Sequence, residues 1–396
     1  MAQGIDNLIN ETSDLSIDSF QWQTYLELVE VEGKGRGYCA RIDISAGTTM
    51  MFDTALVSAP HSSFDATFFL VGDTICYQAY IGKLAKQLFE QSDLMDLLLP
   101  KTPSGKFVSI SSPFPDLYTD TQWQLALDKI YTNVFELFVP GTNNQVSLTK
   151  LYTRTSLFNH SCLPNAIAYG AEDQLLKQHI ESLRDIKKGE EVCISYNKDH
   201  YLPVAERRKY LRQHSFNVDC LCERCALDLS DPKDRFMTVD MDGNLLELNE
   251  ANNTIRERYD TLMHRREGMR KWSSFQMGQQ WMQEGEKWLE DAQRVPYRLH
   301  PHHWMCKHMY EALHDGFMVM LESGHQCKRS TLKEKVLYYY ALDIKAEAAV
   351  LPHYLRSAVD LFVYDCVKVG KSTRWAYKEA RKLDPDVDQI IKRINE

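Results

Sequence analysis

The chain has 396 residues, of which 44% are hydrophobic and 26% are charged, an ordinary balance for a globular protein. Its length exceeds that of a typical single core, so we expect two domains. The formal net charge of −9 excludes a protein held on DNA by bulk electrostatics, and direct nucleic-acid binding is not expected. No apolar run is long enough to predict a membrane span, so no membrane partner is expected.

Residues 1–20 are acidic and polar, and we expect them to form a flexible N-terminal arm. They have neither the basic start nor the apolar centre that is typical of a signal peptide, which predicts a cytoplasmic and/or nuclear protein. Thiols stay reduced in those compartments. Clustered cysteines therefore indicate a metal site before they indicate disulfides.

The first half of the chain alternates between strand-like and helical patterns. Strand-like sequence runs from Trp22 to Ser58, and the alternation of TYLELVEV is broken by the glycine-rich stretch GKGRG at residues 33–37. Helical spacing then predicts an inserted helical region at about residues 62–131. Residues 145–200 return to short strands, the last of which is GEEVCISY. We expect Glu190 and Glu191 in it to be charges at the edge of a turn.

The last part of the chain, residues 229–396, is predicted to be a separate domain. It begins with a β-hairpin that has Asp242-Gly243 at its tip. Nearly everything from about Asn249 onward has helical spacing, with short connections, which predicts a stack of antiparallel helix pairs. No repeat consensus is visible, so a tetratricopeptide-like (TPR-like) arrangement is only a hypothesis. Such a domain could bind a protein partner.

The segment DCLCERC carries three of the ten cysteines, with the spacing C-x-C-x-x-C at Cys220, Cys222 and Cys225. A structural zinc takes four tetrahedral ligands, so a fourth must come from elsewhere. The best candidate is Cys162, which ends the polar run Asn-His-Ser-Cys and precedes Pro164. The alternative is a group of unrelated buried thiols, which their density disfavours. We therefore expect one structural zinc.

Two other stretches are ambiguous when each is taken alone. In GKGRG, the glycines would let a ligand approach the backbone closely, and Lys34 and Arg36 could hold a carboxylate. Any glycine-containing hairpin would look similar, however. Tyr196, at the end of GEEVCISY, could belong to an active site, and the alternative is a half-buried ring at a strand end.

Taken in order, GKGRG, NHSC, GEEVCISY and CLCERC resemble the SET-domain methyltransferases over roughly residues 24–226. The resemblance is closest to the SET-and-MYND (SMYD) branch, which also has a helical C-terminal domain. A MYND finger would add paired C-x-x-C motifs, yet Cys76 is the one cysteine between Phe52 and Asn133. The finger is therefore absent, as in the MYND-less SET proteins with helical tails that are common in fungi.

This resemblance implies an α+β fold in which residues 21–228 form a SET domain of short β-sheets with a pseudoknot. The helical insertion would replace the MYND finger, and a post-SET zinc segment would lie at about residues 212–228. The implied activity is methylation of lysine side chains in a protein or peptide by S-adenosyl-L-methionine. The resemblance assigns Tyr196 to catalysis, Cys162 with the three clustered cysteines to zinc, and the following residues to the cofactor: Lys34, Gly35, Arg36, Gly37, Asn133, Asn159, His160, Tyr196 and Phe216.

The stretch HSFNVDC departs from the family pattern before the first clustered cysteine. Phe216 stands where many relatives have a second active-site tyrosine, and Val218 where a phenylalanine often packs the adenine. Phe216 could thus line the lysine channel and permit more than one methyl transfer, or it could pack the adenine itself. Two other functions stay open: a non-catalytic SET scaffold whose helical domain binds partners, and a SET enzyme that acts on a small-molecule amine.

Overall fold

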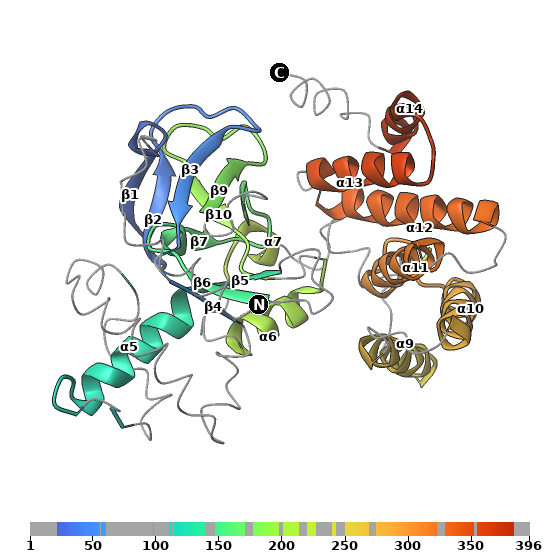
Figure 1. Ribbon diagram of the computed structural model, residues 1–396, viewed down its shortest axis with the longest axis horizontal. Coiled ribbons are helices and arrows are strands. Elements are labelled where there is room, and N and C mark those ends of the chain that lie inside the picture. The colour runs from blue at the N-terminus through green and yellow to red at the C-terminus, as the bar shows by residue number, and fades with distance from the viewer. Residues whose placement is uncertain are drawn as a thin grey trace. The chain divides into compact units, whose positions relative to one another are not determined.

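The computed structural model folds into two compact units, formed by residues 1–196 with 210–220 and by residues 197–209 with 221–396 (Figure 1). Its described residues are 22–55, 57–60, 98, 111–112, 115–138, 147–170, 177–197, 201–213, 220–226, 240–242, 250–268, 275–322, 329–351 and 355–383. The predicted N-terminal arm, residues 1–20, lies outside these ranges, as does Phe216. Each unit is described separately below.

The first sheet of the strand-rich unit has the order β1-β2-β10-β7. Its strands β1 (Leu26–Val31) and β2 (Gly35–Ala40) form the antiparallel hairpin that the GKGRG stretch predicts. The turn requires left-handed backbone at Gly33 and Gly35, where φ is 72° and 78°. Strand β10 (Glu191–Ile194) pairs with β2, and the short strand β7 (Asn159–His160) lies parallel to β10.

Two further sheets are described in this unit. The second sheet has the strand order β3-β9-β8, with β3 at Thr49–Thr54, β9 at Lys177–Ser182 and β8 at Ala166–Gly170. The third sheet has the order β4-β6-β5, with β4 at Val57–Pro60, β6 at Ser147–Leu151 and β5 at Val134–Phe138. Side chains of the first two sheets, together with the segment that precedes β7, share one hydrophobic core. Its buried members are Leu26, Tyr38, Ala40, Ile44, Met50, Met51, Leu157, Phe158, Ala166, Ile180, Ile186, Val192 and Ile194.

In the predicted helical insertion, helix α5 spans Asp120–Asn133. Thr119 and Gln122 form a capping box at its start, because the Gln122 N–H donates to the Thr119 hydroxyl at 3.3 Å and the Thr119 N–H donates to the Gln122 side chain at 2.9 Å. Before α5, residues 98, 111–112 and 115–119 of the insertion are described, and the helical prediction for its other residues lies outside the described ranges.

The second unit is largely helical, as predicted. Helix α6 (Val204–Gln213) belongs to this unit up to Lys209. The other described helices of the unit are α7 (Glu223–Ala226), α9 (Glu250–Gly268), α10 (Phe275–Ala292), α11 (Trp304–Glu322), α12 (Arg329–Val350), α13 (Leu355–Lys368) and α14 (Thr373–Leu383). From α9 onward each helix packs against the next (Figure 1). Of the predicted hairpin, Asp240–Asp242 are described, and Asp240 forms a β-bridge with Leu299.

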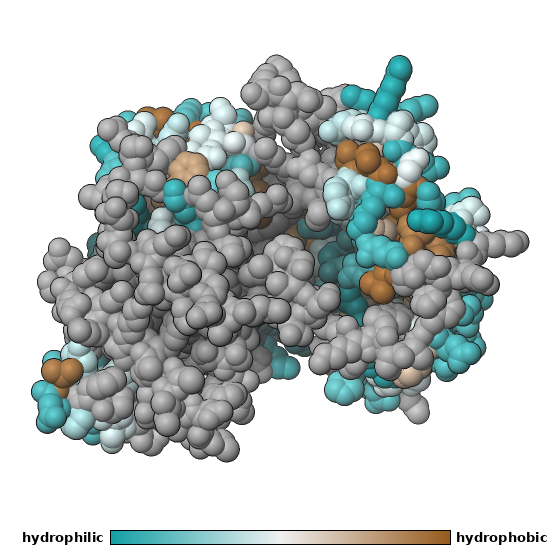
Figure 2. Space-filling view, in the orientation of Figure 1, coloured by the Kyte–Doolittle hydropathy of each residue, from teal (hydrophilic) through white to brown (hydrophobic). Residues whose placement is uncertain are grey.

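Buried tryptophans hold the first two of these helices together. The indole N–H groups of Trp281 and Trp288 on α10 donate to the carbonyls of Leu262 and Ile255 on α9, at 2.8 and 3.0 Å. The visible face of the helical unit mixes hydrophilic side chains with a band of hydrophobic ones (Figure 2). No described helix is both long enough and apolar enough to cross a membrane.

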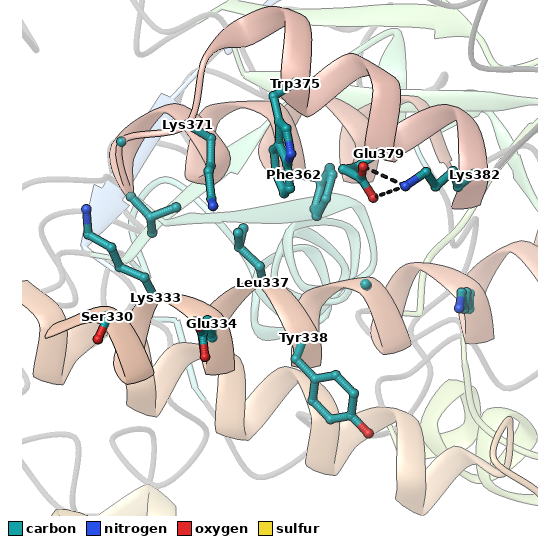
Figure 3. Close-up of a pocket in the computed structure, with 14 residues that line it drawn as sticks. Ser330, Lys333, Glu334, Leu337, Tyr338, Phe362, Lys371, Trp375, Glu379 and Lys382 are labelled. Atoms are coloured by element: carbon teal, nitrogen blue, oxygen red, sulfur yellow. Dashed lines mark hydrogen bonds and ion pairs between the residues drawn. The ribbon is translucent and has the colours of Figure 1, made fainter. Parts of the chain in front are cut away.

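A hollow of about 610 Å³ opens between α12, α13 and α14 (Figure 3). Its apolar floor is formed by Phe362, which is buried, with Leu337 and Trp375 packed against it. Four lysines line the hollow and outnumber its two glutamates: Lys333, Lys345, Lys371 and Lys382, against Glu334 and Glu379. The hollow therefore combines an apolar base with an excess of positive charge.

Candidate active site and metal centre

The segment that carries the predicted site residues is anchored by Asp53, a buried residue on β3. One oxygen of its carboxylate accepts hydrogen bonds from the backbone N–H groups of Arg154 and Thr155, at 2.9 and 2.7 Å, and from the Thr155 hydroxyl at 3.0 Å. Burial raises the pKa of Asp53, and these hydrogen bonds act in the opposite direction. The contacts fix the 3₁₀ turn η4 (Thr155–Leu157), which leads directly into Asn159 and His160.

Asparagine side chains then hold the segment beside β10. Strand β7 places Asn159 opposite Cys193 and His160 opposite Ile194, and the Ser161 N–H donates to the Ile194 carbonyl at 3.0 Å. Asn165 adds two bonds to β10, since its amide oxygen accepts from the Cys193 N–H at 2.8 Å and its amide nitrogen donates to the Glu191 carbonyl at 2.9 Å. This threading brings Asn159 and His160 next to β10, which ends at Ile194, two residues before Tyr196.

Tyr196 is held at both ends by the same segment. Its hydroxyl donates to the Phe158 carbonyl at 2.5 Å, and its backbone N–H donates to Nδ1 of His160 at 3.0 Å. The ring is half-buried, and burial raises the pKa of Tyr196, so the phenol stays protonated at neutral pH. Because the hydroxyl proton is directed at a carbonyl, the hydroxyl oxygen can act toward an incoming group as an acceptor.

A carboxylate lies between two of the residues predicted to hold the cofactor. One oxygen of Glu191 is 2.6 Å from Nζ of Lys34, and the other accepts a hydrogen bond from the Asn159 amide at 2.9 Å. Burial lowers the pKa of Lys34, but the hydrogen bond that Lys34 donates to Glu191 and the attraction of nearby negative charge together outweigh that effect, and the net shift is upward. The sequence predicted only that Glu191 is a charge at the edge of a turn. It did not predict the contacts of Glu191 with both Lys34 and Asn159.

Gly37 makes room for this arrangement. A Cβ atom at Gly37 would lie 2.4 Å from Nδ2 of Asn159, closer than any real Cβ contact. The glycine therefore lets the Asn159 amide rest against the backbone of β2. Neighbouring Gly35 serves the turn through its positive φ, and Arg36 is half-buried on β2.

Asn133 is the last residue of α5 and is buried. Its amide donates to the Lys129 carbonyl at 2.7 Å, a bond within its own helix. A contact between Asn133 and the cofactor stays a prediction, as does every role for Phe216, which lies outside the described residues.

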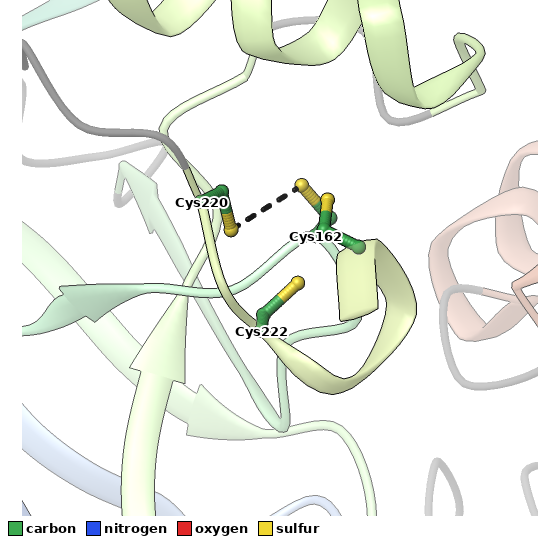
Figure 4. A group of neighbouring side chains, drawn as sticks. Cys162, Cys220 and Cys222 are labelled. Atoms are coloured by element: carbon green, nitrogen blue, oxygen red, sulfur yellow. Dashed lines mark hydrogen bonds between the residues drawn. The ribbon is translucent and has the colours of Figure 1, made fainter. Parts of the chain in front are cut away.

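The four predicted metal ligands come together (Figure 4). The Sγ atoms of Cys162, Cys220, Cys222 and Cys225 all lie within 4.8 Å of one another, and all four side chains are buried. The Cys162 and Cys220 sulfurs are 3.9 Å apart. A tetrahedral zinc with Zn–S bonds of about 2.3 Å would place its sulfurs about 3.8 Å apart, so the donor set fits this ion.

The loop that carries three of these thiols turns them inward. The Cys225 and Ala226 N–H groups both donate to the Cys222 carbonyl at 2.9 Å, which forms the start of α7. Between the buried cysteines, the side chain of Leu221 is 79% exposed.

Nitrogen atoms of two side chains lie close to the sulfurs. Nε2 of His160 lies 3.2 Å from Cys162 Sγ, and the guanidinium of Arg207, on α6, donates to Cys225 Sγ at 3.4 Å. Arg207 is completely buried. A buried cation requires a nearby anion, and four thiolates around Zn²⁺ carry a net charge of −2. The surroundings of the cluster thus also fit a bound zinc, and Arg207 is a residue that the sequence analysis did not single out.

Comparison with known proteins agrees with this geometry. Residues 35–197 match the family model of the SET domain.

The chain contains a SET domain.

Its relatives include SET-and-MYND proteins and other SET proteins. The potential protein lysine methyltransferase SET6 of Saccharomyces cerevisiae is 40% identical over 79 residues, which are 20% of each chain. The histone-lysine N-methyltransferase ASHR2 of Arabidopsis thaliana is 32% identical over 145 residues, 35% of this chain and 33% of the relative. The human protein-lysine N-trimethyltransferase SMYD5 is 38% identical over 84 residues, 21% of this chain and 20% of the relative. The chain thus spans a third or less of the length of these curated relatives.

The match begins at Gly35, directly after Lys34. It includes Arg36, Asn159, His160 and Tyr196. The matched region ends before Cys220, so the cysteine cluster is supported by its own geometry. The resemblance that the sequence motifs indicated is confirmed at the level of a SET domain related to the SMYD proteins.

Proposed function

We propose that this chain is an S-adenosyl-L-methionine-dependent protein-lysine methyltransferase with one structural zinc. The observation that carries the proposal is the match of residues 35–197 to the SET domain, which contains the segment that holds Tyr196 at both ends. The printed names of the relatives, which include protein-lysine and histone-lysine methyltransferases, support the same reaction. A cytoplasmic and/or nuclear location belongs to this proposal, and imaging of the tagged full chain tests it.

The cofactor would supply a methyl group on a sulfonium. Lys34 and Arg36 would hold its carboxylate, and Asn159, with the space that Gly37 leaves, would bind its amino-acid end. Lys34 and Asn159 would then have to share their donors between Glu191 and the cofactor, which makes Glu191 part of the cofactor site. The proposed cofactor set also includes Gly35, Asn133, His160, Tyr196 and Phe216.

The remaining work of the protein is to present a neutral amine in line with the methyl group. A free lysine has a pKa near 10.4, so it must lose a proton before it attacks. A poorly hydrated channel disfavours the ammonium and lowers that pKa. The Tyr196 hydroxyl oxygen would accept weak C–H and N–H hydrogen bonds and so orient the reacting groups.

The direct test is incubation of the full chain with isotopically labelled S-adenosyl-L-methionine and a panel of lysine-rich proteins and peptides. Label that appears on lysine supports the proposal, and Tyr196→Phe serves as the matched control. Cofactor binding without transfer to any protein would contradict it and favour the SET scaffold. Transfer only to small amines in a parallel panel would favour the small-molecule enzyme.

A second activity is supported by the hollow between α12, α13 and α14. We propose that it binds an acidic, extended segment of a partner protein, in line with a TPR-like role for the helical domain. Four lysines line this hollow in a chain whose net charge is −9, so positive charge is concentrated where the overall balance is negative. The apolar floor around Trp375 would accept one large side chain of the segment.

The binding test uses a fluorescent peptide of aspartates and glutamates around one leucine, measured by fluorescence polarisation. Lys333→Glu with Lys345→Glu should weaken binding at least tenfold, and binding should weaken as salt concentration rises. Lys287→Glu, an exposed lysine of α10 outside the hollow, is the control. Equal affinity in the double variant and the control would overturn the proposed surface.

A further inference from the structure

His160 lies between the cysteine cluster and Tyr196, and each of its ring nitrogens has a specific partner. Nδ1 is 3.0 Å from the backbone nitrogen of Tyr196, and Nε2 is 3.2 Å from Sγ of Cys162. The rings of His160 and Tyr196 are also adjacent, with centroids 5.2 Å apart. The family resemblance assigned His160 to the cofactor, whereas the contacts of its side chain point to an additional role.

The first contact fixes the tautomer of the ring. A backbone N–H can only donate, so Nδ1 of His160 must be an unprotonated acceptor. A neutral imidazole then carries its proton on Nε2, which faces the sulfur of Cys162. A metal-bound thiolate is a good acceptor for such an N–H group, and donors of this kind are a regular feature of the surroundings of metal ligands.

We propose that His160 is a positioning residue that links the metal-bound thiolate of Cys162 to the backbone of Tyr196. The linkage continues through Tyr196 itself, because its hydroxyl donates to the carbonyl of Phe158, two residues before His160. Tyr196 is therefore held at its backbone by the His160 ring and at its hydroxyl by the same segment. Occupancy of the metal centre sets the position of the tyrosine. The catalytic meaning of this link rests on the proposed function, but the link itself does not.

Loss of the metal would change the partner of Nε2. Without the metal, the Cys162 sulfur would no longer be a coordinated thiolate fixed in place beside Nε2. The His160 ring would then lose the bond that fixes its orientation, and the Tyr196 N–H would lose a fixed acceptor. The metal would thus act on the active site through one side chain, beside any effect it has on the loop of the other three cysteines.

Two substitutions separate the two ring contacts. In His160→Asn the side-chain oxygen can take the place of Nδ1 and accept from Tyr196, but nothing reaches the sulfur. In His160→Gln the amide nitrogen can take the place of Nε2 and donate to Cys162, but the acceptor for Tyr196 is lost. His179→Asn, at a histidine of the same unit that packs against Phe52, is the matched control.

The first measurement is metal retention, with Co²⁺ in place of Zn²⁺ in the full chain. Loss of an outer-shell partner typically weakens metal binding by about 10–100-fold. We expect His160→Asn to lose cobalt to a chelator at least tenfold faster and to shift the cobalt–thiolate absorption band. His160→Gln and His179→Asn should stay within about twofold of the parent. Parent-like retention and an unshifted band in a folded His160→Asn would overturn the proposal.

The second measurement follows the Tyr196 amide by NMR in a chain labelled with ¹⁵N-tyrosine, with Tyr196→Phe providing the assignment. Removal of the metal should move this resonance in the parent, while that of Tyr38 in the core stays in place. In His160→Gln the same removal should move the Tyr196 resonance much less, because the ring that transmits the change is absent. An unmoved Tyr196 resonance in the metal-free parent would overturn the link.

Both readouts are independent of methyl transfer. A chain that keeps the cobalt and NMR signatures but never methylates a lysine would contradict the proposed function and leave this link intact. A chain that methylates lysine while His160→Asn retains its metal like the parent would contradict the link alone. Circular dichroism of each variant separates either result from loss of folding.

Discussion

The strand-rich unit and the helical unit use buried polar groups in different ways. In the strand-rich unit, Asp53, Asn165 and His160 each bind backbone groups of a segment far away in the sequence, and so fix the positions of a few atoms. In the helical unit, polar side chains join one helix to another, as the pair of His314 on α11 and Asp365 on α13 does. Substitutions of these anchoring groups should therefore disturb the candidate site as well as the fold, whereas substitutions of the pairs between helices should change stability alone.

The largest effect is expected from Cys222→Ser. Removal of a ligand should weaken metal retention by more than the roughly 100-fold limit for loss of an outer-shell partner, because structural zinc sites need all four donors. Elemental analysis should find one zinc per chain in the parent and none in the variant. Cys39→Ser, at a half-buried cysteine of β2, should retain the metal. A metal-free parent or a second metal would contradict the account.

Asp53→Ala should destabilise the strand-rich unit by about 3 kcal/mol, because two buried N–H groups and a hydroxyl lose their acceptor. Asp53→Asn keeps one acceptor oxygen and should recover much of that loss. Urea unfolding followed by circular dichroism measures both. Asp43→Ala, at an exposed ion pair with Lys187, should change little. If Asp53→Ala unfolds like the Asp43 variant, the anchoring role of Asp53 is wrong.

His314 predicts a pH dependence of the helical unit. Burial lowers the pKa of His314, but hydrogen bonds to Asp315 and Asp365 outweigh it and raise the pKa to about 9. A raised folded pKa stabilises the fold fully below the unfolded pKa of about 6.5, and that contribution is lost as pH rises through about 9. His314→Gln should therefore cost on the order of 1–3 kcal/mol at pH 6 and little at pH 10.

The measurement is urea unfolding of the parent and His314→Gln at several pH values. His264→Gln, at a histidine of α9, is the control. A stability difference between the parent and His314→Gln that grows as pH rises would contradict the prediction. Metal retention should be unaffected in both variants, because neither histidine belongs to the cysteine cluster.

The smallest effect is expected from Gly37→Ala. The added methyl group must displace the Asn159 amide, which is the flexible end of a side chain, so the fold should survive. Cofactor binding should weaken by about 1 kcal/mol, the scale of one net hydrogen bond. Calorimetry of S-adenosyl-L-methionine binding measures it, with Gly189→Ala as a control glycine that has open space around it but a positive φ. Unchanged affinity would remove Asn159 from the cofactor site.

The sequence predicted the parts of this site that depend on local spacing. The C-x-C-x-x-C loop, the glycine hairpin at Lys34 and the strand-like stretch that ends at Tyr196 are all recognisable over a few residues. Asp53, Glu191 and Arg207 were missed because their partners lie 102, 32 and 18 positions away. For Asp53 there was a signal: an acidic residue that ends the apolar run Met50-Met51-Phe52 must find donors if it is buried.

The helical unit was predicted from periodicity, which finds helices but not the side chains between them. The hollow lined by lysines depends on which faces of α12, α13 and α14 meet, and no pattern within one helix specifies that. The chemistry of the strand-rich unit was accessible for the opposite reason, because its residues are of uncommon types at fixed spacings.

Tyr196→Phe gives the most direct test of the central claim. With saturating cofactor and a lysine substrate from the panel, the rate of a single methyl transfer should fall by about two orders of magnitude or more, as loss of one well-placed transition-state contact does. Cofactor affinity and thermal stability should stay near those of the parent. Transfer by Tyr196→Phe at the parent rate would show that Tyr196 is only a ring at a strand end and would contradict the proposed active site.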